Sequence, residues 1–204
     1  MDVRMWFSIC VLLYHMPDAA SVREKVLFEN SSSINEVDVD TLNVTVLVRH
    51  GDTNGVYSLD YDYQNKYVYF PRHNAMDIMQ FPYPSQNIVL QHVVNTSSNP
   101  VGVTVDSTND HVYWVNDGDN KLSRCQSDGT NVVVVSTGLS NTFMIQLDVI
   151  NRWFYIGYFN YGISKSRFDL ADISMIVNFT AQAYCMDIGM FYECLIHVKK
   201  ICEV

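Results

Sequence analysis

Short apolar runs alternate with polar turn segments along most of the chain. The clearest unit spans 101–137, where clusters of Ser, Asn, Asp and Gly separate four such runs: 101–105, 111–115, 121–125 and 131–137. Runs of β-branched and aromatic residues bounded by such clusters are typical of antiparallel strands joined by tight turns. The pattern therefore predicts one four-stranded antiparallel sheet in this unit.

The same unit recurs at a nearly fixed spacing. A pair made of an aspartate and a tyrosine seven residues later recurs at intervals of 44 and then 42 residues: Asp62 and Tyr69, Asp106 and Tyr113, Asp148 and Tyr155. A period of roughly 40–45 residues with four strands per copy is the spacing of propeller blades. Tyr and Val are prominent in the composition, which also favours an all-β protein.

The best copy continues with an aromatic pair, Tyr113-Trp114, and then with Arg124 and an Asp128-Gly129 turn. This pattern resembles the low-density lipoprotein receptor class B repeat, known as the YWTD repeat. Six such repeats form a six-bladed β-propeller in the extracellular part of lipoprotein receptors and Wnt co-receptors. The resemblance covers 24–180 and implies a non-catalytic module whose rim loops bind an extracellular protein ligand or neighbouring receptor modules.

We therefore expect a partial β-propeller of about three and a half four-stranded blades. The segments are an incomplete blade at 24–49, blades at 55–95, 100–137 and 142–180, and at 183–204 a further blade's start or a divergent tail with cysteines. The resemblance implies that the first blade lacks its first strand. Such an array leaves apolar faces open. A truncated product, a fragment that pairs with another chain and a short array covered at its ends are the three explanations.

The segment 1–20 resembles a secretory signal peptide. Arg4 precedes an apolar run at 5–14, and Ala19 and Ala20 offer small residues for cleavage. Ten apolar residues are too few to span a bilayer. We expect removal of this segment, no direct membrane insertion afterwards, and a chain that is secreted or lies outside the plasma membrane within a longer receptor. The alternative is that the apolar run forms a buried strand of an N-terminal blade.

The net charge bears on possible partners, and secretion bears on disulfides and glycans. A net charge of −9 disfavours nucleic acid and anionic membranes and would suit a basic partner. Secretion would permit a disulfide between Cys185 and Cys194 or between Cys194 and Cys202. It would also make four Asn-x-Ser/Thr sites glycan acceptors, at Asn30, Asn43, Asn95 and Asn178.

The sequence predicts no catalytic residue, metal site or cofactor. Neither a Gly-x-Ser-x-Gly nor a His-Glu-x-x-His motif is present. The recurring aspartates stand beside turns and are expected to cap backbone N–H groups. Aromatic residues on turns are the expected ligand contacts, because Tyr and Trp are favoured at interface hot spots: Phe81, Tyr83, Tyr158 and Tyr161. Packing between blades is the alternative for these four residues. A calcium-dependent six-bladed hydrolase and a truncated product without independent function are the alternative functions.

Overall fold

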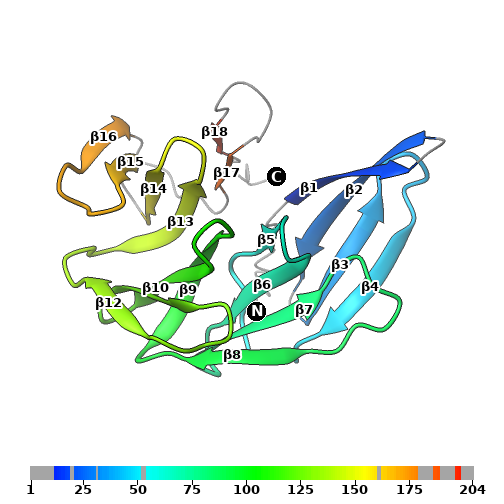
Figure 1. The fold of residues 1–204 in the computed structure, drawn as a ribbon, viewed down its shortest axis with the longest axis horizontal. Coiled ribbons are helices and arrows are strands. Elements are labelled where there is room, and N and C mark those ends of the chain that lie inside the picture. Colours follow the sequence, from blue (N-terminus) through cyan, green and yellow to red (C-terminus); the bar gives the residue numbers. More distant parts are fainter. Residues whose placement is uncertain are drawn as a thin grey trace, which may run out of the picture.

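The computed structural model describes residues 12–18, 21–30, 32–51, 54–159, 162–178, 186–188 and 196–198. All regular elements in this part of the chain are β-strands. They form four four-stranded antiparallel sheets and one two-stranded sheet. Each four-stranded sheet is one continuous segment with its strands in chain order, and the four sheets stand side by side in a fan (Figure 1). The prediction of an all-β partial propeller is thus confirmed.

Each sheet corresponds to one blade. The first contains β1 (Leu12–Asp18), β2 (Ser21–Glu29), β3 (Ser33–Asp38) and β4 (Val44–Arg49). The second contains β5 (Asp60–Asp62), β6 (Tyr67–Arg72), β7 (Asp77–Pro82) and β8 (Gln91–Asn95). The third contains β9 (Asn99–Asp106), β10 (His111–Asp117), β11 (Leu122–Gln126) and β12 (Val133–Ser136). The fourth contains β13 (Thr142–Asp148), β14 (Trp153–Tyr158), β15 (Gly162–Arg167) and β16 (Ser174–Val177). A further pair, β17 (Met186–Ile188) and β18 (Ile196–Val198), follows, with β17 next to β13.

The first blade has one strand more than the sequence predicted. Strand β1 pairs antiparallel with β2, with Leu12 opposite Leu27, so the blade of the uncleaved chain has four strands, whereas three are predicted for the chain without the segment 1–20. A short apolar run satisfies both a signal sequence and an inner strand, and the residue pattern alone does not separate them. Cleavage of the signal segment stays a prediction, and it would remove β1 and leave β2 as the innermost strand.

Most buried side chains of the described residues lie between blades, in three successive layers, and a smaller cluster belongs to the fourth blade alone: Met144, Tyr155 and Ile163. The layer between the first and second blades includes Leu27, Ile34, Phe70 and Phe81. The layer between the second and third blades includes Tyr69, Ile78, Val105, Trp114 and Cys125. The layer between the third and fourth blades includes Tyr113, Val115, Leu147, Phe154 and Ile156. Each inner blade is therefore stabilised from both sides, as expected for stacked repeats.

The repeated aromatic pair divides its two side chains between these layers. Successive residues of a strand point to opposite faces of its sheet. In β6, Tyr69 contacts the third blade and Phe70 contacts the first. In β10, Tyr113 contacts the fourth blade and Trp114 contacts the second. The sequence repeat is thus a packing repeat, with one large side chain for each neighbouring blade.

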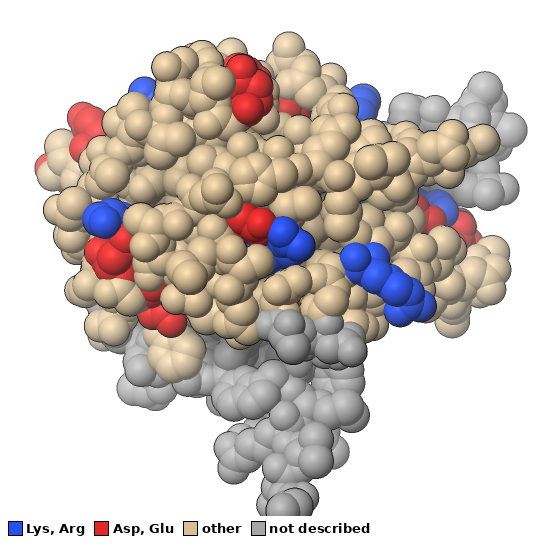
Figure 2. Space-filling model, turned by 90° about the horizontal axis from the view of Figure 1, so that it is seen from below, with Lys and Arg blue, Asp and Glu red and all other residues tan. Residues whose placement is uncertain are grey.

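The outermost strands expose several apolar side chains: Val44 and Val46 in β4, Val133 and Val134 in β12, and Met175, Ile176 and Val177 in β16. Strand β8 differs, because its Val93 and Val94 are buried. Figure 2 shows the side of the molecule that faces down in Figure 1, where acidic and basic side chains are few and scattered. This side therefore presents no continuous patch of one charge among the described residues.

Candidate functional site

The recurring aspartates close the hairpin between the first two strands of their blades. Asp62 Oδ1 accepts hydrogen bonds from the N–H groups of Gln64 and Asn65, both at 2.9 Å. Asp148 Oδ1 accepts the N–H of Asn151 at 2.9 Å. In all three hairpins, an asparagine three residues after the aspartate donates its side-chain amide to Oδ2 of that aspartate: Asn65, Asn109 and Asn151. The Asp-x-x-Asn spacing was readable in the sequence, and these bonds are those of a structural turn.

A second polar series, missed in the sequence, lies on the innermost strands two residues before the aspartates. Asp60 Oδ2 accepts the hydroxyl of Thr104 and the N–H of Val105, both at 2.7 Å. The Thr104 hydroxyl oxygen accepts the N–H of Leu147 at 3.1 Å. A chain of buried hydrogen bonds thus runs from the second blade through the third to the fourth. The series escaped notice because its members differ chemically, and only their shared spacing marks them.

Replacing Thr104 with valine should lower the free energy of unfolding by about 1–3 kcal/mol. Valine keeps the shape of the side chain but leaves the buried N–H of Leu147 without this acceptor and removes one donor from Asp60. Urea denaturation followed by tryptophan fluorescence measures the change. The control is Thr130→Val at an exposed turn hydroxyl, which should cost less than about 1 kcal/mol. Equal losses of unfolding free energy in the two variants would show that the buried hydrogen bonds of Thr104 stabilise the fold no more than an exposed hydroxyl does.

Three of the four expected ligand contacts are buried, so that prediction was wrong for them. Phe81 and Tyr83 are 0% and 2% exposed and pack between the first and second blades. Tyr158 is 7% exposed and packs between the third and fourth blades. The Tyr83 hydroxyl donates to the carboxylate of Glu36, so this residue links two blades instead of facing solvent. Tyr161 lies outside the described residues.

The expected glycan acceptors lie at strand ends or in turns. Three are exposed: Asn43 immediately before β4, Asn95 at the end of β8, and Asn178 immediately after β16. Asn30 is half-buried in a turn, where its Oδ1 accepts the N–H groups of Ser32 and Ser33. The three exposed asparagines are therefore better placed to carry a glycan, and attachment stays a prediction for all four.

Cys125 is a buried free thiol in the layer between the second and third blades. Burial raises the pKa of Cys125 to about 12, so the thiol stays protonated at neutral pH and acts as a packing residue. The expected disulfide cysteines, Cys185, Cys194 and Cys202, lie outside the described residues. Within the described ranges, no group of three or more His, Cys, Asp or Glu side chains could hold a metal ion. The same ranges contain no helix with the length and apolar character needed to cross a bilayer.

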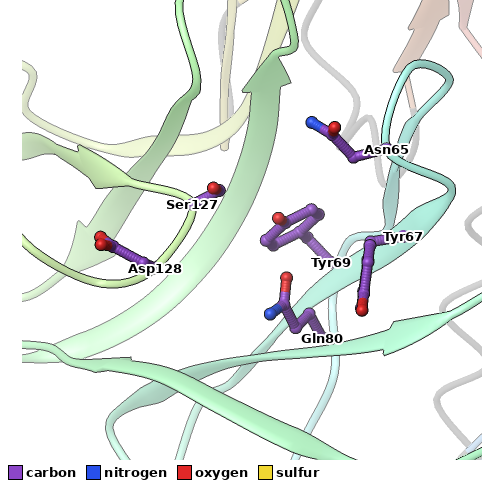
Figure 3. A pocket seen from close by; sticks show the side chains of 6 residues that line it. All are labelled: Asn65, Tyr67, Tyr69, Gln80, Ser127 and Asp128. Atoms are coloured by element: carbon purple, nitrogen blue, oxygen red, sulfur yellow. The ribbon is translucent and has the colours of Figure 1, made fainter.

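A pocket of about 330 Å³ opens between the second and third blades (Figure 3). Its lining comes from both blades: Asn65, Tyr67, Tyr69, Gln80, Ser127 and Asp128. Tyr69 on β6 and Gln80 on β7 are directly opposite each other in the sheet. The Gln80 side chain donates from Nε2 to Gln91 Oε1 at 3.1 Å, whereas its own Oε1 is buried without a hydrogen-bond partner. The pocket therefore contains an acceptor that no group of the described residues satisfies.

Acidic groups surround this pocket. Burial, and then the charges of Asp62 and Asp110, raise the pKa of the Tyr69 hydroxyl well above its usual value. Hydrogen bonds from the hydroxyl and N–H of Thr130, both to Oδ1, lower the pKa of Asp128. Asp128 stands at the margin of the pocket with its carboxylate directed away from Tyr69 (Figure 3). None of the six lining residues is basic and one, Asp128, is acidic, so the lining itself carries negative charge.

The corresponding place between the third and fourth blades is filled by protein side chains. Arg124 lies opposite Tyr113 in the sheet, as Gln80 lies opposite Tyr69, and its Nη1 donates to His111 Nε2 at 2.8 Å. Phe168 covers this junction, with its ring stacked 4.7 Å from that of Phe154 and 6.2 Å from that of Tyr113. His111 and Trp153 hold equivalent positions in their blades, and Gln126 and Arg167 lie directly opposite them in the sheets. The residues that follow, Ser127 and Phe168, are therefore equivalent as well. The pocket thus exists where one junction has serine and glutamine and the other has phenylalanine and arginine.

Acidification should weaken the junction between the third and fourth blades. Burial, and then the charge of Arg124, lower the pKa of His111; Asp106 and Asp110 oppose this shift and Arg152 adds to it. Because the folded state favours neutral His111, its contribution is complete above the unfolded pKa of about 6.5 and is lost as pH falls below that value. Urea midpoints at pH 7.5 and 5.5 should differ more for the native chain than for His111→Gln, while exposed His92→Gln should behave like the native chain. An unchanged pH dependence in His111→Gln would refute this assignment.

Comparisons with known proteins agree on the fold. No protein-family model matches the sequence, and no curated protein matches it. Among solved structures, the chain is similar to a chain in a crystal structure of a nidogen/laminin complex, with a TM-score of 0.72 and 16% identity over 82% of this chain and 66% of that chain. It is also similar to a structural genomics protein of unknown function from Bacteroides thetaiotaomicron, with a TM-score of 0.60 and 14% identity over 74% of this chain and 40% of that chain.

The chain thus spans less than two thirds of the length of either matched structure. At sequence identities of 16% and 14%, these similarities show a shared fold and nothing more. The four stacked blades and these matches define the class of protein as a β-propeller, present here in part.

Proposed function

We propose that this chain is an extracellular protein-binding propeller module without catalytic activity, related to the propellers of lipoprotein receptors and Wnt co-receptors. The observation that carries the proposal is the likeness of its four blades, over 82% of the chain, to a propeller chain from a complex of two proteins, nidogen and laminin. A rigid stack of blades holds its rim turns in fixed positions, and such turns are suited to recognising a partner surface.

Charge and surface features are compatible with this role. A net charge of −9 favours a partner with basic groups. The pocket between the second and third blades opens beside two rim turns, one carrying Asn65 and the other Asp128. Asn43, Asn95 and Asn178 are exposed, as glycan acceptors of an extracellular protein would be. We propose that the chain is secreted or lies on the extracellular face of the plasma membrane as part of a longer receptor.

Expression of the full chain in a secretory cell line tests the location. A C-terminally tagged chain should reach the medium, lose mass on enzymatic removal of N-glycans, and begin just after Ala20. Replacing the asparagines with glutamine, singly, should remove the glycan at each occupied site. A chain that stays in the cytosol without glycans would contradict the extracellular assignment.

Surface plasmon resonance against purified extracellular proteins, laminin among them, tests the binding role. The native chain should give saturable binding to at least one of them, and the same chain after thermal unfolding should not. A parallel assay with ester and lactone substrates, with and without calcium, tests the alternative. Metal-dependent turnover without saturable protein binding would replace the binding module with a hydrolase.

A further inference from the structure

The position opposite the repeated tyrosine carries a cation in two of the three blades that share the repeat. In the third blade it is Arg124, bonded to His111. In the fourth blade it is Lys165, whose Nζ lies 4.8 Å from the ring centroid of Trp153. His111 and Trp153 themselves occupy one common register position, at the start of β10 and β14. These two blades thus each place a basic side chain against an aromatic ring, Arg124 by a hydrogen bond to the ring nitrogen of His111 and Lys165 over the ring of Trp153.

The second blade has the aromatic partner but lacks the cation. Tyr67 stands at the position of His111 and Trp153, and neutral Gln80 stands at the position of the cation. The Gln80 Oε1 atom is buried without a partner and requires a donor. Serine at position 127, in place of the phenylalanine that covers the next junction, leaves this place open as the pocket.

We infer that this pocket binds an arginine side chain of the protein partner. A guanidinium group can donate to Gln80 Oε1, lie against the tyrosine rings and be attracted by the surrounding carboxylates. Figure 3 shows Tyr69 in the middle of the pocket with the Gln80 oxygen directed toward it. The negative charges of Asp62 and Asp110, which act on Tyr69, and of Asp128 in the lining disfavour anionic ligands and favour a cation. The partner's arginine takes the place that Arg124 takes in the next blade. This inference names a chemical feature of the partner and so rests on the proposed binding function.

NMR titration of the ¹⁵N-labelled full chain tests the inference. The probe is N-acetyl-L-arginine amide, and its neutral isostere N-acetyl-L-citrulline amide is the comparison. The arginine probe should cause saturable amide shifts confined to residues 65–69, 80 and 127–129, and citrulline should bind at least about tenfold more weakly because it lacks the charge. Equal binding of the two probes, or shifts spread over the whole chain, would overturn the inference.

Two substitutions reproduce the filled junction of the next blade. Gln80→Arg supplies the chain's own cation, and Ser127→Phe supplies the covering ring; either should abolish the arginine-induced shifts. Both variants should stay folded, because the third and fourth blades already carry this pair, and a dispersed amide spectrum checks this. If one variant fails to fold, the other decides. Undiminished arginine binding in a folded variant would overturn the inference.

A pair of acidic turns supplies the matched charge control. Asp128→Asn should weaken arginine binding severalfold, whereas Asp169→Asn should leave it unchanged, because the exposed Asp169 holds the same turn position in the fourth blade, away from the pocket. If the two variants weaken arginine binding equally, the binding depends only on the overall charge of the protein and not on this pocket, and the inference is overturned. If the native chain binds a protein saturably but does not bind the arginine probe, only this inference is overturned. Arginine binding without any protein binding would count against the proposed function alone.

Discussion

Replacing Trp114 with alanine should lower the free energy of unfolding by about 3–5 kcal/mol. Trp114 is 2% exposed and packs in the layer between the second and third blades, together with Tyr69, Ile78 and Cys125. Removing the indole leaves a cavity in the middle of the array, and the sheets on both sides are held by hydrogen bonds and cannot close it. Urea or thermal denaturation followed by circular dichroism measures the loss.

Trp153 provides the matched control for this change. It is half-buried on β14, and its ring lies beside the Lys165 ammonium and 3.8 Å from the Arg167 guanidinium. Trp153→Ala removes the same side chain from a partly exposed place and should cost about 1–2 kcal/mol. If the two variants lose equal stability, the layer between the second and third blades is not the packed core that the structure shows.

Replacing Gly129 with alanine should cost about 2–5 kcal/mol, from two separate effects. Gly129 has φ +82, a conformation that costs an L-residue about 1–2 kcal/mol. Its added Cβ would also lie well inside contact distance of the Val93 carbonyl oxygen, and overpacking against rigid backbone costs about 1–3 kcal/mol. Differential scanning calorimetry of the variant should therefore show a much lower melting temperature.

Gly138→Ala is the control for Gly129→Ala. A Cβ at Gly138 meets no atom within 4 Å, so this change should leave stability within about 0.5 kcal/mol of the native value. Gly129 lies in the turn that carries Ser127 and Asp128, where this turn packs on β8. The alanine variant should therefore also lose arginine binding in the pocket. Native stability in Gly129→Ala would show that this turn does not dock on the second blade.

The sequence could predict the blades because their repeat is carried by large side chains. Each blade needs one bulky residue for each neighbour, and Tyr113 with Trp114 meets both needs. The turn aspartates were also predictable, since their partners are local backbone N–H groups. Residues that bond to nearby backbone groups, or that fill the same packing position in every blade, thus recur at regular intervals in the sequence and can be predicted from it.

Features fixed by contacts between blades could not be predicted in the same way. Phe81 near the end of β7 and Tyr83 directly after it stand next to two prolines and were expected in an exposed turn, but the first blade covers them. Asp60 and Thr104 serve one hydrogen-bond chain with different chemical groups, so no residue type repeats. Burial of these residues depends on which blade stands next to which, and that arrangement is not encoded in local spacing.

The pocket is the clearest case of this limit. It arises from small or neutral residues, Gln80 and Ser127, at positions where the next blade has Arg124 and Phe168. A serine in a turn and a neutral residue on a strand are common in any β protein, so neither stands out as a motif. Only the register of paired strands shows that these positions correspond, and this correspondence is what identifies the pocket as a site for an external cation.

Amide hydrogen exchange of the full chain, read by mass spectrometry, tests most directly whether the sequence repeat folds as successive packed blades. Strands β6, β10 and β14 are each paired on both sides and lie in the buried layers, so their amides should exchange most slowly. Protection should therefore peak around Tyr69, Tyr113 and Tyr155, at intervals of 44 and 42 residues, and fall at the outer strands β8, β12 and β16. Protection without this period, or outer strands as protected as β10, would contradict the stacked-blade account.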